Sequence, residues 1–372
     1  MKIQVSKSEL LNKLKMAAKV TAASKTMPIL ADFKLTVTDN TFLVTGSDME
    51  GSIICHVDTI SISGIEPDVQ KSLMVDKTLL NALAELADQP VEITISNDYS
   101  ISVKYSGGNF ELQGSDTEDY PFMVTQGERK QISIPKQTLV EGIKTCAGFA
   151  GKNEIRPVMS GVYINATDTL DFVATDAHSL GLRKYDMQLD QLSVIVPTKC
   201  AKVITDILAK DKSEDEVLIN VYDRNLQIDF GRYILTYRLI EGRYPNYPAV
   251  IPTGHTTKMV VSVADLISSI RRVSVFANSD SKLLKLDVSE SGNIGIRVQD
   301  IDYKKSANEQ MTAQVKGEDL SIGMNSAKLI EVLSTIDTDN CEILFSGPSR
   351  AVIVHPEGDS SVTLLLMPML LN

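Results

Sequence analysis

Apolar and polar residues follow the same order at three places along the chain, about 130 residues apart. Each place is a short alternating strand that runs directly into an amphipathic helix, at residues 3–10, 132–139 and 260–266. The same helical position is held by Leu10, Leu139 and Leu266, and a later one by Val20, Phe149 and Phe276. One type of domain is therefore repeated three times in tandem.

A second strand followed by a helix comes roughly 60 residues after the first in each copy. These segments are residues 73–80, 194–201 and 322–329. Asp76 and Asn325 stand where the helices begin and suit the N-cap position, and Pro197 suits a first helical turn. The pattern predicts six helices, with strands in nearly all of the chain between them.

Turn-forming residues separate pairs of alternating runs at residues 37–42, 106–109, 166–169, 223–225 and 289–293. Along residues 33–37, 91–95 and 226–230 the alternation is clean, which is typical of antiparallel sheet with one wet face. The sequence predicts an α+β fold in which each copy is a pair of antiparallel sheets, each backed by one helix.

A length of 372 residues exceeds what one hydrophobic core usually serves. We expect three domains, at residues 1–122, 129–250 and 251–372. No apolar run approaches membrane-spanning length, and the first residues indicate a strand rather than a signal peptide. The cysteines are scattered singly, which favours free, buried thiols in a reducing cytoplasm; they are Cys55, Cys146, Cys200 and Cys341.

The net charge of −11 argues against nucleic-acid binding, but its distribution is uneven. Acidic residues cluster in predicted turns at 116–119 and 213–216, whereas the predicted helices carry a modest basic excess. Ordinary solvated helix faces are the more frequent explanation for such lysines, so a further observation is needed before DNA binding is preferred. Charge alone therefore leaves DNA binding open.

Four motifs carry a resemblance to a known family. They are Met-Pro-Ile-Leu at 27–30, Ala-Thr-Asp-Ala-His-Ser-Leu at 174–180, Glu-Gly-Arg-Tyr-Pro-Asn-Tyr-Pro at 241–248 and Leu-Met-Pro-Met at 366–369. In this order they resemble the bacterial DNA polymerase III beta subunits, the sliding clamps, over the whole chain. The resemblance implies a head-to-tail homodimeric ring, with helices lining a central hole and sheets forming the outer layer.

The implied function is to encircle duplex DNA and to tether the replicative DNA polymerase and other replication and repair proteins. An ATP-dependent clamp loader would place the ring on DNA, in the cytoplasm at the nucleoid. Such a subunit needs no cofactor and has no catalysis of its own, although it is catalogued with the polymerase activity of its holoenzyme.

The resemblance also implies three groups of site residues. Those expected at DNA are Lys25, Lys152 and Arg156, with Lys15, Lys19 and Lys202 as further candidates that could be plain surface lysines. Those expected in a pocket for partner peptides are Met159, Thr175, His178, Leu180, Pro245, Val250, Leu365, Met367, Pro368 and Met369. Those expected at the dimer interface are Phe110, Val275 and Phe276, and for Phe276 simple core packing is the alternative.

Two other classes of function stay open. An enzyme would need a catalytic constellation, and the one candidate is a hydrolase that uses Asp176 and His178. The four histidines stand alone, with no pair at metal-ligand spacing and no phosphate loop. A tandem-repeat interaction scaffold without DNA is the other alternative, and it predicts no retention on circular DNA.

Overall fold

The computed structural model describes residues 1–22, 26–121, 123, 125–152, 155–209 and 216–371. Six α-helices lie within them, as the sequence predicts: α1 (Lys7–Ala17), α2 (Thr78–Glu85), α3 (Lys136–Ala147), α4 (Thr198–Leu208), α5 (Val263–Ser274) and α6 (Ser326–Leu333). Three short 3-10 helices accompany them: η1 (Pro28–Ala31), η2 (Pro157–Met159) and η3 (Tyr247–Val250).

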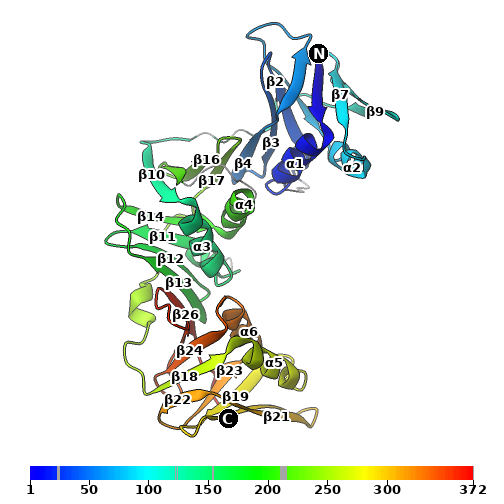
Figure 1. Ribbon diagram of the computed structural model, residues 1–372. Helices are drawn as coiled ribbons and strands as arrows, with labels where there is room; N and C mark the ends of the chain where they lie inside the picture. The colour runs from blue at the N-terminus through cyan, green and yellow to red at the C-terminus, as the bar shows by residue number, and fades with distance from the viewer. Residues whose placement is uncertain (23–25, 122, 124, 153–154, 210–215, 372) are drawn as a thin grey trace. The chain divides into compact units, whose positions relative to one another are not determined.

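Each α-helix follows one strand and precedes a meander of three antiparallel strands (Figure 1). The first copy contains β1 (Lys2–Ser6), β2 (Phe33–Val37), β3 (Phe42–Ser47), β4 (Gly51–His56), β5 (Thr59–Ser63), β6 (Lys71–Val75), β7 (Pro90–Ile95), β8 (Ser100–Tyr105) and β9 (Gly108–Gln113). The middle copy contains β10 (Lys130–Pro135), β11 (Gly161–Ala166), β12 (Leu170–Thr175), β13 (Ser179–Tyr185), β14 (Leu192–Pro197), β15 (Glu216–Val221), β16 (Asn225–Asp229) and β17 (Tyr233–Arg238). The third contains β18 (Thr257–Ser262), β19 (Leu283–Val288), β20 (Asn293–Asp300), β21 (Lys305–Thr312), β22 (Gln314–Gly317), β23 (Leu320–Asn325), β24 (Asn340–Phe345), β25 (Val352–Pro356) and β26 (Val362–Leu366).

The two halves of each copy exchange their first strands. In the first copy β1, which leads into α1, pairs with β7 of the other half, and β6, which leads into α2, pairs with β2. The middle copy repeats this with β10–β15 and β14–β11, and the third with β18–β24 and β23–β19. The weak repeat inside each copy is therefore a structural repeat as well.

All five predicted hairpins are confirmed. They join β2 to β3, β8 to β9, β11 to β12, β15 to β16 and β19 to β20. Asn325 caps α6 as predicted, because its side-chain oxygen accepts a hydrogen bond from Lys328 N. The other two helix starts differ by one residue. Lys77 is the N-cap of α2, although Asp76 still accepts a hydrogen bond from Thr78 N at 2.8 Å, and Pro197 ends β14 before α4 begins.

Each copy contributes two sets of antiparallel strands, as predicted, and two of the four sheets extend over neighbouring copies. β17 of the middle copy pairs with β4 of the first, and β13 of the middle copy pairs with β26 of the third. An arginine–aspartate ion pair accompanies each junction, Arg232 with Asp58 and Arg183 with Asp359. The described chain accordingly divides into two compact units, residues 1–138 with 203–239 and residues 139–202 with 240–372.

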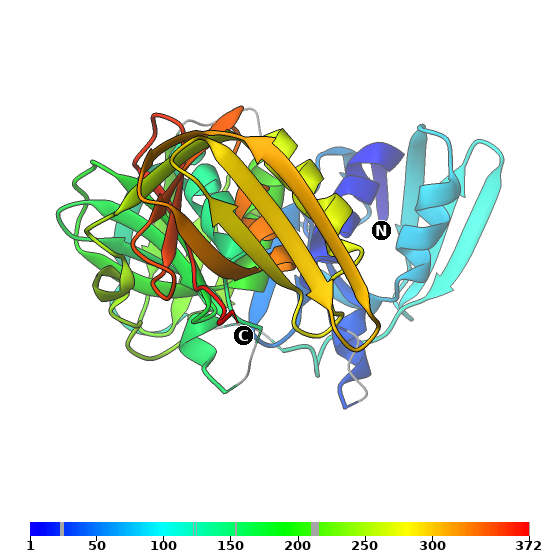
Figure 2. The same cartoon turned by 90° about the horizontal axis from the view of Figure 1, so that it is seen from below.

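The last strand of each meander is the strand that makes such a junction. Of the six last strands, β4, β17, β13 and β26 pair with one another in the described structure. β9 and β21 each pair on one side only, with β8 and β20. Figure 2 shows β20 and β21 as a long hairpin that lies beside α5. Two equivalent edges of the described sheets are therefore open.

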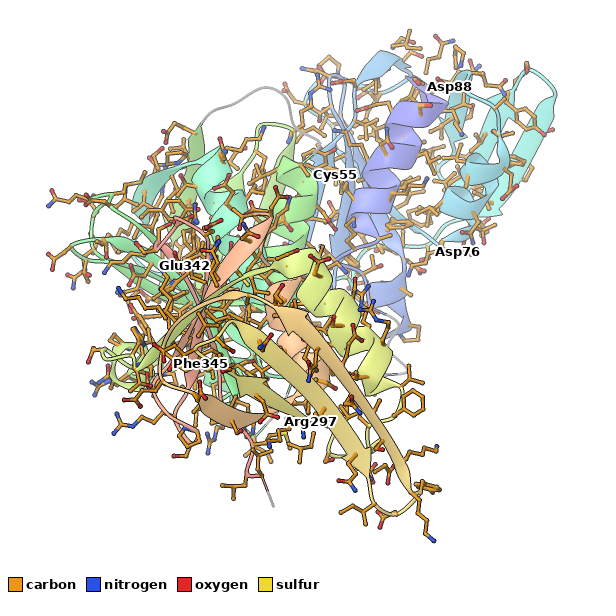
Figure 3. All side chains as sticks on the ribbon, turned by 60° about the horizontal axis from the view of Figure 1, so that its bottom comes forward. Cys55, Asp76, Asp88, Arg297, Glu342 and Phe345 are labelled. Carbon is orange, nitrogen blue, oxygen red and sulfur yellow. The ribbon has the colours of Figure 1, made fainter. Side chains whose placement is uncertain are left out.

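The helices cover the apolar faces of the sheets at close range. α1 packs on β3 and β4, where a Cβ added to Gly46 would lie 2.4 Å from the carbonyl oxygen of Ala17. Cys55 of β4, labelled in Figure 3, is fully buried, and the other three cysteines are also buried and form no disulfide in the described structure. None of the described helices has the length and apolar character needed to cross a membrane.

Candidate functional site

The most developed candidate site lies where the turn between β12 and β13 meets β26. In this ladder Ser179 is opposite Leu366, and Leu180 is opposite Leu365. Leu180 and Leu365 are 2% and 3% exposed and share one apolar cluster. The structure thus brings together two residues, 185 positions apart in sequence, that were both predicted for the peptide pocket.

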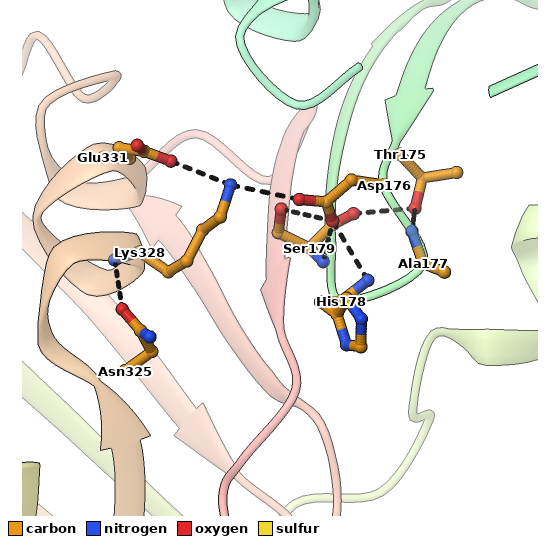
Figure 4. Close-up of polar contacts among 8 residues, drawn as sticks. All are labelled: Thr175, Asp176, Ala177, His178, Ser179, Asn325, Lys328 and Glu331. Atoms are coloured by element: carbon orange, nitrogen blue, oxygen red, sulfur yellow. Dashed lines mark hydrogen bonds and ion pairs between the residues drawn. The ribbon is translucent and has the colours of Figure 1, made fainter. Parts of the chain in front are cut away.

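The turn itself is held by the side chains of Thr175 and Asp176 (Figure 4). Thr175 Oγ1 donates a hydrogen bond to the carbonyl oxygen of Ser179 at 2.7 Å and accepts one from Ala177 N at 3.1 Å. Asp176 Oδ1 accepts hydrogen bonds from His178 N, Ser179 N and Ser179 Oγ at 3.0, 2.7 and 2.9 Å. Thr175 is therefore a buried turn-forming residue, and His178 is left exposed above it.

The carboxylate of Asp176 is also paired with Lys328, whose Nζ lies 3.0 Å from Oδ2. Burial raises the pKa of Asp176, but the hydrogen bonds from Ser179, Lys328 and His178 N outweigh it and hold the pKa below its usual range. The contact with His178 is made by the backbone amide and not by the imidazole. This arrangement does not form the acid–base pair that the hydrolase alternative needs.

A cleft of about 480 Å³ opens beside this turn. Its lining residues are Gly151, Ile155, Arg156, Met159, Asp176, Ala177 and His178. Met159 is half-buried, whereas Ile155 is 82% exposed. A flexible methionine and an exposed isoleucine beside a polar turn suit an apolar peptide side chain with a polar neighbour. Two of the predicted peptide residues, Met159 and His178, thus share this cleft with Arg156, which was predicted for DNA.

The segment after β26 continues along the same turn. Met367 N donates a hydrogen bond to the carbonyl oxygen of His178 at 2.8 Å, and the Met367 side chain is 42% exposed. Pro368 and Met369 are half-buried, and Met369 N donates to the carbonyl oxygen of Gly323 at 2.8 Å. Met367 therefore lies at the His178 turn, whereas Met369 is tied to β23.

The segment around η3 supplies the remaining predicted residues. Pro245 is half-buried and accepts a hydrogen bond from Tyr247 N at 2.8 Å, and Val250 is 55% exposed. Tyr244, immediately before Pro245, is buried in the cluster of Leu180 and Leu365. Its ring stacks on that of Tyr163, with centroids 4.5 Å apart.

The prediction missed the aromatic support beneath the pocket. Besides Tyr244, Tyr247 packs on the cluster, and its hydroxyl donates to Asp171 Oδ2 at 2.7 Å. Burial raises the pKa of both phenols. Both tyrosines belong to the quoted motif at 241–248, so the motif was the available signal.

The residues predicted for DNA are exposed wherever the structure describes them, while Lys25 lies outside the described residues. Lys15 and Lys19 lie on α1, and Lys19 forms an ion pair with Asp206. The other exposed ones are Lys152, Arg156 and Lys202. Surface exposure is what phosphate contacts need, but part of the charge of Lys19 is already compensated.

The residues predicted for the dimer interface lie beside the two open edges. Phe110 belongs to β9, is half-buried and packs on Tyr105, with ring centroids 4.9 Å apart. Val275 caps the end of α5, which packs on β21, and is 77% exposed. Phe276 is 43% exposed, so the described chain does not bury it as it buries Val20 and Phe149.

Comparison with known proteins covers nearly the entire chain. Three family models, the N-terminal, central and C-terminal domains of the DNA polymerase III beta subunit, match residues 1–124, 133–246 and 248–370. The beta sliding clamp of Synechocystis is 26% identical over 398 residues and that of Bacillus subtilis 24% over 380, each comparison covering 99% of both chains.

Solved structures have the same fold. The DNA polymerase III beta subunit of Thermotoga maritima has a TM-score of 0.91 at 24% identity, with both chains covered completely. A sliding clamp of Pseudomonas aeruginosa bound to griselimycin has the same TM-score, identity and coverage.

Proposed function

The chain belongs to the family of DNA polymerase III beta subunits, the beta sliding clamps, and we propose that two copies of it close head to tail into a ring around duplex DNA. It is a non-catalytic processivity subunit, which keeps the replicative polymerase on its template. We place its three domains at residues 1–122, 129–250 and 251–372.

The observation that carries the ring is the pair of open strands β9 and β21. The four other last strands of meanders pair between neighbouring copies, so the repeat itself supports the same pairing between β9 of one subunit and β21 of the next. Phe110 stands on the first edge, and Val275 and Phe276 stand near the second. Two such interfaces would close a two-subunit ring with no open meander edge.

Within the ring, DNA would be held by sequence-independent phosphate contacts. Lys152 and Arg156, together with Lys25, are the residues we propose for these contacts, and Lys15, Lys19 and Lys202 are further candidates. The net charge of −11 would discourage DNA from binding elsewhere on the surface. Retention would then come from topology, so the individual contacts can be weak enough to allow sliding.

The cleft beside His178 would receive short peptides from the replicative polymerase, the clamp loader and other replication and repair proteins. Of the ten residues named for this pocket above, Leu180 and Leu365 belong to one apolar cluster, which would form its floor, and exposed Val250 and Met367 would be available to a ligand. The four cysteines are buried and form no disulfide in the described structure, which supports a cytoplasmic setting. We propose that the protein is associated with the nucleoid there. We propose no cofactor.

The test is to load the protein onto nicked circular DNA with its clamp loader and ATP, isolate the complex in moderate salt, and cut the DNA once. We expect retention on circles and loss from linear molecules, because a ring slides off a free end. Equal retention on cut DNA, or none on circles with an active loader, would contradict the ring and favour the scaffold without DNA.

A further inference from the structure

The ion pair between Lys328 and Asp176 joins the third copy to the turn that carries His178 in the middle copy (Figure 4). We propose that Lys328 is a positioning residue for the peptide cleft, which holds Asp176 so that this turn presents His178 in a fixed orientation. The inference rests on the proposed peptide-binding function of the cleft. Lys328 belongs to α6, which does not line the cleft, so it would act on the site through Asp176.

Asp176 connects the turn to α6 because its two carboxylate oxygens bind different partners. Oδ1 accepts three hydrogen bonds from within the turn, and Oδ2 faces Lys328 Nζ at 3.0 Å. The carboxylate cannot rotate without breaking both sets of contacts. Lys328 therefore fixes the orientation in which Oδ1 binds the amides of His178 and Ser179.

The turn needs such support because its backbone is unfavourable. Ala177 has φ of +73°, in the left-handed region that non-glycine residues rarely adopt. Strained turns of this kind persist only where surrounding contacts determine them. Here these contacts are the hydrogen bonds of Thr175 and Asp176. The orientation of the Asp176 carboxylate depends in turn on its ion pair with Lys328.

Lys328 is itself well placed to act as an anchor. Its backbone amide donates to Asn325 Oδ1 at 3.0 Å in the first turn of α6, and its Nζ also lies 3.0 Å from Glu331 Oε2. The side chains of Lys328 and Asp176 are 33% and 19% exposed, so water screens this pair less than a fully exposed one.

Loss of the lysine would affect binding in two ways. Asp176, Ala177 and His178 all line the cleft, so a looser turn would add an ordering cost to every ligand that contacts them. The half-buried negative charge of Asp176 would also lose the ammonium with which it is paired. Both effects weaken binding without removing an atom that lines the cleft.

The experiment compares the wild-type chain with Lys328→Met, which keeps the aliphatic stem, and Lys328→Arg, which keeps the charge. Lys258→Met is the matched control, because Lys258 Nζ pairs with Glu342 at 2.7 Å on strands remote from the turn in sequence. Calorimetric titration uses griselimycin, the ligand of the Pseudomonas aeruginosa clamp structure. We expect Lys328→Met to weaken binding roughly three- to tenfold, and the other two variants to stay within about twofold of wild type.

Amide hydrogen exchange, measured without ligand, decides the positioning independently. Exchange at His178 and Ser179 should be faster in Lys328→Met than in the wild type, and unchanged in Lys258→Met. Unchanged exchange in Lys328→Met would overturn the proposal, even if affinity fell, because the lysine would then act on the ligand directly.

A second variant, Asp176→Asn, guards against a general loss of stability. Asparagine keeps an acceptor for the turn amides but removes the charge, so Lys328→Met should have little further effect on exchange in this background. Additive effects would contradict a shared ion pair. Absence of griselimycin binding by the wild type would count against the peptide site itself, and retention on circular DNA tests the ring separately.

Discussion

Phe149 and Phe276 occupy the same position in two tandem copies, yet Phe149 is 5% exposed and Phe276 is 43% exposed. The adjacent Val275 is 77% exposed. Val20 and Phe149 are buried at this position in the first two copies, whereas Phe276 is at the surface in the third. The exposed copy is the one beside the open strand β21.

This difference predicts opposite effects for the same substitution. Phe149→Ala should lower the free energy of unfolding by about 3–5 kcal/mol, because it leaves a cavity in a core. Phe276→Ala should change the free energy of unfolding little. It should weaken the dimer, so that the dimer dissociates at a higher protein concentration than the wild type does. Denaturant titration measures the first quantity and sedimentation velocity the second. A Phe276→Ala protein that loses stability and stays dimeric would show that Phe276 is a core residue.

Removal of Lys152 and Arg156 should weaken DNA contact equally for all sequences. Each lost phosphate contact lowers the slope of log affinity against log salt by about one unit. The measurement is binding of the double alanine variant to short linear duplexes over a series of salt concentrations. Lys258→Ala serves as control, because its ammonium is already paired with Glu342. An unchanged slope in the double variant would remove these residues from the DNA site.

The buried thiols should make the fold sensitive to alkaline pH. Burial raises the pKa of Cys55 and of Cys341 to about 12, from an ordinary value near 9. Between those values the unfolded chain loses thiol protons that the folded chain keeps. The free energy of unfolding should therefore be independent of these thiols below about pH 9 and fall above it, by at most about 1.4 kcal/mol per pH unit for each.

Urea unfolding of the wild type and of Cys55→Ala at several pH values tests this, because the variant should show a shallower decline above pH 9. An identical pH dependence would mean that the Cys55 thiol titrates alike in both states. Iodoacetamide gives a second measurement: at pH 8 it should modify the four cysteines only after unfolding.

The junction between the first two copies should not tolerate a methyl group at Gly51. In the β4–β17 ladder Gly51 is opposite Tyr237, and an added Cβ would lie 2.4 Å from the tyrosine ring. Because Tyr237 is 1% exposed and has little room to move, Gly51→Ala should cost about 1–3 kcal/mol of stability. Gly148→Ala, which has no atom within 4 Å of the new Cβ, should cost almost nothing; equal costs would contradict this explanation. Thermal unfolding compares the two.

The periodic pattern was sufficient to predict the six helices and five hairpins, because these depend on neighbours in sequence. It could not predict that β4 pairs with β17 or that β13 pairs with β26. Alternation shows which face of a strand is buried. It does not show the partner of an edge strand, because strands pair through backbone N–H and C=O groups that nearly all residues share. The pattern therefore predicted two sets of strands for each copy but not which of them continue into the neighbouring copy.

For the candidate site too, local motifs could be recognised in the sequence, whereas contacts between distant residues could not. Leu180, Leu365 and His178 were predicted through motifs, whereas Lys328 looked like one more basic residue of a helix. Its role depends on a contact with Asp176 across 152 positions of sequence. Likewise, an apolar residue at a helical repeat position has the same signature whether it packs in a core or at an interface. The 43% exposure of Phe276 in the structure favours the interface.

The exchange of first strands between half-copies determines when each part of the chain can fold during synthesis on the ribosome. Lys2 of β1 pairs with Thr94 of β7, so β1 waits for a partner that is translated about ninety residues later. At 5–20 residues per second the delay is roughly 5–20 s. Because each half of a copy lacks a strand until the other half appears, nascent chains should fold in whole-copy steps, and protection from protease should rise in three increments as the chain lengthens.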